Sequence, residues 1–348
     1  MAGLKTAGFT SQPCSSFLGN VTFNPACSNV NINSSQNVLP PDALRVAQIV
    51  VAVIIFAIGL PFNGLVIWVL GFRRSGRNSF AAYVLNLAIA DLVLVMRIPL
   101  AIGYLVAYYQ WTFGELTCKL IMFLRVLGLF AGAFLLSAIS MERCLCLLHP
   151  VWYRLRRPPW VVPVTCVLLW SLALGLSIPY LLSSQVCSLR NRSQCFESLL
   201  PQPGLYITET VLGFLLPLLL FISCNLVILL KAKRDTSPKY AKLFKVLTLT
   251  IVVFLICWVP YHICRFLKSL YSSCPNSKIY AEATKGVYYS LYLVFVKSSL
   301  NPALYVFAGK DLRKSVKASL MSVIEGIFSD EPSDSRLRRS LRGQESLV

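Results

Sequence analysis

Seven runs of mostly apolar residues, each long enough to cross a lipid bilayer, divide this chain. A transmembrane helix needs about 20 predominantly apolar residues. Only short polar links separate the runs, so no room remains for a separate soluble domain. The runs cover residues 46–72, 79–108, 116–147, 160–182, 205–230, 243–270 and 283–308. The sequence therefore predicts an all-α membrane protein whose seven transmembrane helices form one bundle over residues 46–308.

The composition agrees with a membrane protein and leaves polar ends outside the bundle. Of the 348 residues, 56% are hydrophobic and 14% are charged, and the mean hydropathy of +0.66 exceeds that of a soluble domain of this length. Residues 1–45 form an N-terminal tail without the apolar core of a signal peptide. Residues 326–348 are polar and charged, which is typical of a disordered tail.

Basic residues lie mainly on one side of the predicted bundle. If the N-terminus lies outside the cell, 20 of the 33 lysines and arginines fall in the cytoplasmic links and tail. Positively charged loops remain in the cytoplasm, so we expect a plasma-membrane protein with an extracellular N-terminus. The net charge of +19 then reflects topology and attraction to anionic lipids of the inner leaflet. Nucleic acid is not an expected partner, because the basic residues are scattered over several links.

Three N-glycosylation sequons indicate the same orientation. Asn20, Asn33 and Asn191 each begin an Asn-X-Ser/Thr sequence, and all of them lie on the predicted outer side. Because glycosylation occurs outside the cytoplasm, we expect these asparagines to carry glycans.

Cysteines on the outer side indicate disulfide bonds, which persist in an oxidising environment. Cys118 lies at the start of the third run and Cys195 in the loop after the fourth. A bond between them would hold this loop over the mouth of the bundle, and we expect it to form. The remaining outer cysteines are Cys14, Cys27, Cys187 and Cys274. Their pairing cannot be deduced from the sequence, although a tie between the N-terminal tail and the last outer loop is one solution.

Each predicted helix carries a short motif. The motif residues are Asn63 in GLPFNGLVIW, Asp91 in LNLAIADL, Glu142-Arg143-Cys144, Trp170, Pro217, Trp258 and Pro260 in CWVP, and Asn301, Pro302 and Tyr305 in NPALY. In this order they resemble the motifs of rhodopsin-class (class A) G-protein-coupled receptors, over residues 46–320. The resemblance implies a receptor that signals through a heterotrimeric G protein.

Some of these residues are expected to form an activation switch. A proline inside a membrane helix removes a backbone hydrogen bond and kinks the helix, so the segments around Pro260 and Pro302 are the expected moving parts. Glu142 and Arg143 are expected to form a charge pair that opens to meet a partner. The expected switch residues are Asp91, Glu142, Arg143, Trp258, Pro260, Lys297, Asn301, Pro302 and Tyr305.

Charged residues in the outer half of the bundle indicate the ligand. Arg97, Arg125 and Arg265 lie there with one acid, Glu209, which predicts a positive cavity. Arginine suits a carboxylate, and an aliphatic and aromatic lining suits a lipid tail. Snorkelling of the arginines, or pairing of Arg125 or Arg265 with Glu209, is the alternative. The other expected ligand-binding residues are Tyr104, Tyr261, His262 and Tyr288 or Tyr289.

Longer segments resemble particular groups within the family. ETVLGFLLPLLL, PYHICRFL and AGKDLRKS are similar to the leukotriene B4 receptors, whereas SAISMERCLCLLHPVWYRLRRP is similar to the prostaglandin D2 receptor of the chemoattractant group. The resemblance implies an eicosanoid such as leukotriene B4, or another small anionic lipid, as agonist and an inhibitory G protein as partner. A formyl-peptide-like ligand with a free carboxylate, or a prostaglandin D2-like ligand, is the alternative.

Enzymes, transporters and photoreceptors need features that this chain lacks. It has two histidines, no HExxH motif and no glycine-rich phosphate loop, so we expect no catalytic residue, metal site or cofactor. No internal repeat or matching pair of broken helices indicates a transporter. An opsin would hold retinal on a lysine at the position of Phe295, and Lys297 is turned from that position by about 200° on a helix.

Lys297 is a charged residue inside the seventh run, where it costs about 2.5–3.5 kcal/mol. It lies one helical turn before Asn301, on the helix that in this family faces Asp91 across a small cavity where sodium commonly sits. The third run contributes Gly128 and Gly132, not polar residues, to that cavity. We therefore expect the Lys297 ammonium to replace sodium and to pair with Asp91. The alternative is a Lys297 that snorkels or faces a watery channel unpaired.

The C-terminal segment carries signals for partners. Residues 309–325 place apolar side chains at helical spacing opposite lysines, which predicts an amphipathic helix on the membrane surface. Serines beyond residue 329 are expected phosphorylation sites that recruit an arrestin. The last four residues, ESLV, fit a PDZ-domain ligand.

Overall fold

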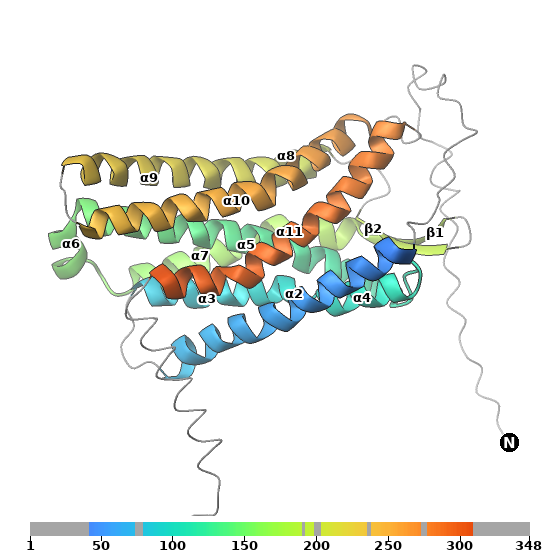
Figure 1. The fold of residues 1–348 in the computed structure, drawn as a ribbon, viewed down its shortest axis with the longest axis horizontal. Helices are drawn as coiled ribbons and strands as arrows, with labels where there is room; N and C mark the ends of the chain where they lie inside the picture. Colours follow the sequence, from blue (N-terminus) through green and yellow to red (C-terminus); the bar gives the residue numbers. More distant parts are fainter. Residues whose placement is uncertain are drawn as a thin grey trace, which may run out of the picture.

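The chain forms one elongated bundle of helices in the computed structural model, with a β-hairpin near one end (Figure 1). The structure describes residues 42–73, 79–189, 192–197, 203–234, 238–272 and 277–308. The long helices run side by side along the long axis of the molecule. This architecture confirms the predicted helical membrane bundle.

The long helices occupy the seven predicted runs. They are α2 (Asp42–Trp68), α3 (Ser79–Val95), α5 (Gly114–Leu148), α7 (Val161–Ser183), α9 (Leu216–Arg234), α10 (Pro238–Leu270) and α11 (Lys278–Ala308). Shorter elements extend or join them: η2 (Val69–Arg73), α4 (Ile98–Val106), α6 (Pro150–Leu155), β1 (Gln185–Leu189), β2 (Arg192–Phe196), α8 (Pro203–Thr210) and η3 (Val211–Leu215). Six helical segments of the described chain have the length and hydropathy of a membrane span. The seventh run lies in α11, which is 31 residues long and less apolar.

Prolines account for two interruptions in these helices. The second membrane segment is divided between α3 and α4, because Pro99 has no N–H to donate to the carbonyl of Val95 and its ring crowds that carbonyl. In the fifth segment, the π-helical turn η3 lies just before Pro217, which cannot donate to the carbonyl of Gly213. The first of these breaks places Arg97 at the N-cap of α4.

α5 is the central helix of the bundle. Its most apolar 18-residue window is 78% buried, against 22% for α7 and 28% for the first membrane segment. It packs against α3, α7 and α9. A Cβ atom at Gly128 would clash with the side chain of Leu94 and lie 3.2 Å from the carbonyl oxygen of Ala90. The glycine at this position therefore permits the close approach of α5 and α3.

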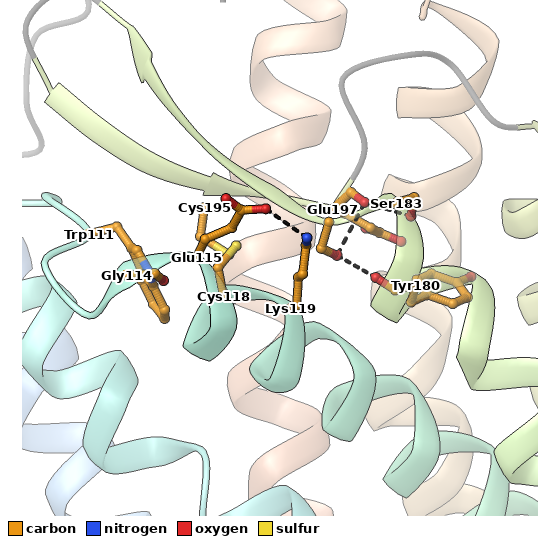
Figure 2. The surroundings of a disulfide bond; sticks show 10 residues. Trp111, Gly114, Glu115, Cys118, Lys119, Tyr180, Ser183, Cys195 and Glu197 are labelled. Carbon is orange, nitrogen blue, oxygen red and sulfur yellow. Dashed lines mark hydrogen bonds and ion pairs between the residues drawn. A yellow bond between two sulfur atoms is a disulfide. The ribbon is translucent and has the colours of Figure 1, made fainter. Parts of the chain in front are cut away.

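The β1–β2 hairpin lies at the N-terminal end of α5. Its strands are antiparallel, and Val186 on β1 is opposite Cys195 on β2. The disulfide bond between Cys118 on α5 and Cys195 confirms the predicted bond and joins the hairpin to the bundle (Figure 2). The backbone N–H of Trp111 also donates to the carbonyl of Ser193 at 2.7 Å. These links hold the hairpin over one end of the helices.

Several predictions concern parts of the chain outside the described residues. Cys187 is disulfide-bonded. The other cysteines with open pairing, the sequons and the tail lie outside the described residues: Cys14, Cys27, Cys274, Asn20, Asn33, Asn191, 309–325 and 326–348. These expectations remain predictions.

Candidate ligand-binding site

Four charged side chains meet below the hairpin, in the half of the bundle that the sequence predicts to be the outer one. Arg125 comes from α5, Arg265 from α10 and Glu209 from α8, and only 2–3% of each residue is exposed. The fourth, Glu197, follows β2 directly and lies two residues beyond the disulfide-bonded Cys195. Figure 2 shows Glu197 next to Ser183 and Tyr180 at this end of α7.

Arg265 binds both acids. Its Nη1 lies 2.5 Å from Glu197 Oε2 and its Nη2 lies 2.8 Å from Glu197 Oε1, which makes the contact bidentate. Nη2 also donates to Glu209 Oε2 at 2.6 Å. Bidentate pairs of this kind are stronger than single hydrogen bonds. Because the pair is buried, removal of either partner would leave an uncompensated charge.

Arg125 completes the same network from the opposite helix. It lies 3.0 Å from Glu197 and 3.4 Å from Glu209, and it donates to the hydroxyl of Tyr261. Tyr261 in turn donates to Glu209 Oε1 at 2.5 Å, and Tyr180 donates to Glu209 Oε2 at 2.9 Å. Both carboxylates are therefore shared by two arginines, and Glu209 also accepts from two tyrosine hydroxyls.

This network corrects the expectation of three arginines against one acid. The alternative, pairing of Arg125 and Arg265 with Glu209, is what the structure shows, and Glu197 adds a second carboxylate. Burial alone would raise the pKa of Glu197, but the neighbouring Arg265 and Arg125 outweigh burial and hold that pKa well below its usual range. The clue in the sequence was the position of Glu197, two residues after the cysteine that fixes the loop.

Arg97 differs from the other two arginines. It is only 7% exposed, and its Nε and Nη1 atoms make no hydrogen bond with the described residues. Its guanidinium lies over the ring of Phe295 on α11, 5.8 Å from the centroid. Among the described residues, no acid forms an ion pair with it. A buried, uncompensated guanidinium is costly unless a ligand or water supplies acceptors.

Aromatic side chains surround these charges. His262 stacks on Trp258 at 5.4 Å between centroids and on Phe214 at 4.6 Å, and its Nδ1 lies 3.2 Å from Thr210 Oγ1. Tyr104 packs edge-on against Tyr109 at 5.7 Å. The structure thus places Tyr261 and His262 at the charged network, whereas Tyr104 packs with Tyr109 and Trp111 under the hairpin.

α11 carries two further tyrosines near this part of the bundle. Tyr288 and Tyr292 lie one helical turn apart, with 6.0 Å between their ring centroids. Their hydroxyls are buried and act on each other, but neither makes a well-formed hydrogen bond in the described chain. Tyr292 was not predicted, although its spacing from Tyr288 on one helix face could have indicated it.

The residues around Lys297 form a polar group deeper in the bundle. Asn301 Nδ2 donates to Asp91 Oδ2 at 2.7 Å, and both residues are buried. Lys297 is 4% exposed, and its charge acts on Asp91 and Cys257, but it forms no direct ion pair with Asp91. The expected direct pair is therefore corrected: Asn301 supplies the hydrogen bond, and Lys297 lies within electrostatic range.

The C-terminal end of α5 departs from prediction as well. Glu142 pairs with Arg157, at 2.5 Å, and accepts from the hydroxyl of Tyr153 at 2.6 Å. Arg143 instead lies over the ring of Phe80, 3.6 Å from the centroid. The expected pair of Glu142 and Arg143 is thus replaced by a pair between α5 and the loop that follows it. Burial, with the hydrogen bond to Glu142, raises the pKa of Tyr153 to about 12.

The remaining switch residues lie on the two kinked helices. Pro260 lies inside α10, two residues beyond Trp258, which stacks on Phe254 at 5.6 Å. Pro302 lies inside α11. The side chain of Tyr305 lies outside the described part of the structure. Within the described residues, no group of histidine, cysteine or acidic side chains could hold a metal ion.

Known proteins are similar to this chain over most of its length. Residues 62–305 match the family described as 7 transmembrane receptor (rhodopsin family). The C3a anaphylatoxin chemotactic receptor of Danio rerio is 31% identical over 314 residues, which cover 89% of this chain and 84% of that receptor. Chemerin-like receptor 1 of Homo sapiens is 31% identical over 308 residues, covering 82% and 81%. Prostaglandin D2 receptor 2 of Mus musculus is 30% identical over 304 residues, covering 83% and 79%.

Proposed function

Since this chain belongs to the rhodopsin family of seven-transmembrane receptors, we propose that it is a plasma-membrane receptor for a small anionic lipid, an eicosanoid such as leukotriene B4. One observation carries the proposal: buried positive charge exceeds buried negative charge in the outer bundle. Arg97, Arg125 and Arg265 lie there against two acids, Glu197 and Glu209. An anionic ligand would compensate the remaining charge.

The lining favours a lipid over a strongly polar ligand. Aromatic rings lie against two of the arginines, Phe295 of α11 against Arg97 and Tyr261 of α10 against Arg265. Sites for lipid-like molecules combine such surfaces with a few polar groups. Prostaglandin D2 receptor 2 is among the similar proteins, and it is named for a lipid that carries a carboxylic acid. The segments that resemble leukotriene B4 receptors include Glu209 and Arg265, which are parts of the charged network.

A population shift can convert binding into a signal. We expect the ligand to contact α4, α5 and α10, and to favour an arrangement in which α10 swings outward around Pro260. This movement would open the cytoplasmic end next to Arg143 and the 147–157 segment. A G protein of the inhibitory type would bind there, and an arrestin would bind after phosphorylation of the tail. No covalent step is required.

The outer and inner ends of the chain have proposed roles of their own. We place the N-terminus outside the cell with glycans at the three sequons, and the C-terminal helix on the inner membrane surface. The terminal ESLV sequence would bind a PDZ domain. Epitope accessibility in intact cells tests the orientation, because an N-terminal tag should bind antibody without permeabilisation.

A peptide with a free carboxylate is the second candidate ligand. Two of the similar receptors are named for C3a and chemerin, not for a lipid. A terminal carboxylate would meet the same arginines as a fatty acid would. The two classes of ligand differ in the size and polarity of the body that carries the carboxylate.

A ligand panel tests the proposal. Cells that express the full chain would receive leukotriene B4, prostaglandin D2 and formyl-Met-Leu-Phe, and forskolin-stimulated cyclic AMP would be measured. We expect a saturable decrease with an eicosanoid, abolished by pertussis toxin if the G protein is of the inhibitory type. A response to the peptide alone would favour the second candidate, and no response to any acid would count against an anionic ligand.

A further inference from the structure

We infer that Arg97 binds the acidic group of the ligand and that the hydroxyls of Tyr288 and Tyr292 donate hydrogen bonds to the same molecule. The inference rests on the proposed anionic ligand and deepens it. The Arg125 and Arg265 pair, by contrast, already holds the receptor's own carboxylates. The chemical class that fits is a molecule with one free carboxylate on an apolar, unsaturated or aromatic body.

The positive charges of Arg125 and Arg265 are already paired with carboxylates of the receptor. Glu197 contacts both arginines, at 3.0 Å from Arg125 and 2.5 Å from Arg265. Glu209 lies 2.6 Å from Arg265 and also accepts from Tyr180 and Tyr261. Two arginines and two carboxylates therefore pair within one buried cluster, and Lys268 adds a further positive charge near Glu197. A ligand carboxylate placed there would have to displace a carboxylate that is already bound.

Arg97 has no such partner among the described residues. It is 93% buried, because its relative exposure is 7%, and two of its nitrogen atoms make no hydrogen bond. Its charge and that of Arg125 act on each other unfavourably. The guanidinium fork offers parallel N–H groups that suit a bidentate carboxylate. Arg97 is thus the described arginine of the outer bundle whose charge remains available to a ligand.

The groups next to Arg97 along α11 lack acceptors as well. Phe295 lies under Arg97 and 6.5 Å from the ring of Tyr292, which lies 6.0 Å from Tyr288. In the described chain, the two tyrosine hydroxyls are buried and act on each other, but neither makes a well-formed hydrogen bond. Nε1 of Trp258, on α10, is buried and unbonded as well. Unbonded buried donors cost free energy. A bound molecule with a carboxylate at Arg97 and oxygen atoms along its body would satisfy these donors, while the rings pack against its apolar parts.

The thermal stability of the purified full-length receptor without ligand tests whether Arg97 is uncompensated. We expect Arg97→Met to raise the Tm by at least about 2 °C, because it removes a buried charge that has no partner. Arg265→Met should lower the Tm, because it leaves Glu197 and Glu209 without that partner. If Arg97→Met lowers the Tm as Arg265→Met does, Arg97 is a paired structural residue and the inference is overturned.

Ligand affinity tests whether Arg97 binds the acidic group. The probes are leukotriene B4, prostaglandin D2 and their methyl esters, which lack the negative charge. For whichever lipid binds, the wild type should bind the free acid about 10- to 100-fold more tightly than its methyl ester. Arg97→Met should abolish this difference in affinity, and Arg97→Lys should retain part of it. The control is Arg45→Met, which removes an arginine at the outer end that pairs with Asp42.

The outcomes separate the inference from the proposed function. If Arg97→Met binds the free acid more tightly than the ester by the same factor as the wild type does, the assignment of Arg97 is overturned. The proposal of an anionic ligand then still stands. Equal affinity of the wild type for acid and ester contradicts the anionic ligand itself. If neither acid binds, the leukotriene-type proposal fails, and the ligand-free Tm comparison still decides whether Arg97 is compensated.

Discussion

Buried arginines in this bundle have two different surroundings. Arg125 and Arg265 each contact two carboxylates, whereas Arg97 lies over an aromatic ring with two nitrogen atoms unbonded in the described chain. The first arrangement joins the outer loop to α5, α8 and α10. The second leaves a charge for a ligand. Two of these arginines thus hold the loop to the helices, and we propose that the third recognises the ligand.

Glu197 should be important for stability because it pairs with both Arg125 and Arg265. We expect Glu197→Gln to destabilise the receptor by about 3–5 kcal/mol, since Arg125 and Arg265 would lose a shared buried carboxylate. Thermal unfolding of the purified protein measures the change. Glu115→Gln is the matched control, because Glu115 pairs with Lys119 on the exposed surface of α5 at 2.7 Å and should contribute less than about 0.5 kcal/mol. Equal losses in both variants would contradict a closing role for Glu197.

The same contact should respond to pH only under acidic conditions. Arg125, Arg265 and Lys268 face Glu197 together with the acid Glu209, and the pKa of Glu197 is lower in the folded receptor than in the unfolded chain. Its contribution is therefore complete above the unfolded pKa of about 4.3 and is lost as the pH falls below that value toward the folded pKa. We expect the Tm difference between wild type and Glu197→Gln to stay constant from about pH 8 to 5. A difference that titrates in that range would show a raised pKa instead.

Lys297 should make the receptor insensitive to sodium. Its charge acts on Asp91, whose Oδ2 accepts from Asn301. A sodium ion at this place would meet a like charge, so we expect sodium to leave agonist affinity unchanged in the wild type. Lys297→Ser should introduce sodium sensitivity and change basal activity. Radioligand binding in sodium and in N-methyl-D-glucamine chloride measures the first effect, and strong inhibition of the wild type by sodium would contradict the idea of a tethered cation.

Residue positions could be predicted from the sequence more reliably than their partners. Arg97, Arg125, Arg265 and Glu209 were placed in the outer bundle by their distance from the motifs, and the structure brings them close together. Glu197 was missed because its position depends on how the disulfide-bonded loop folds over the helices. Pairing across helices depends on tertiary contacts that no local pattern encodes.

At the scale of elements, apolar length and proline positions determine most of what is seen. The seven predicted runs match the helices, since a bilayer sets the length of each span. The breaks before Pro99 and Pro217 follow from the missing proline N–H groups. The short helix α6 and its contact with α5 were not predicted, because docking of a loop depends on the neighbouring helices.

α6 should be held by the pair of Glu142 and Arg157. We expect a double-mutant cycle of Glu142→Gln and Arg157→Met to give a coupling free energy of about 0.5–3 kcal/mol, because the two side chains lie 2.5 Å apart and mostly buried. Arg156→Met, at the exposed neighbouring position, is the control for Arg157. Glu142→Gln should also speed amide hydrogen exchange in residues 150–155. Additive effects within error would mean that the pair does not hold the loop.

Across the whole molecule, charge is arranged in three layers along the bundle. Arginines and acids lie below the hairpin, Asp91 with Asn301 and Lys297 lies deeper, and Glu142 with Arg157 lies at the C-terminal end of α5. α10 and α11, which contain Pro260 and Pro302, pass through more than one of these layers. A ligand that changes the outer layer can therefore bias the inner one through these helices, provided that it binds the two arrangements with different affinity.

The most direct test is the affinity of the wild-type receptor for a free acid and for its methyl ester. Purified full-length protein would be titrated with leukotriene B4 and with its uncharged ester, under the same salt and pH. We expect the free acid to bind at least about 10-fold more tightly, because the outer bundle holds more buried positive than negative charge. Equal affinity, or tighter binding of the ester, would contradict a receptor built to recognise an anion.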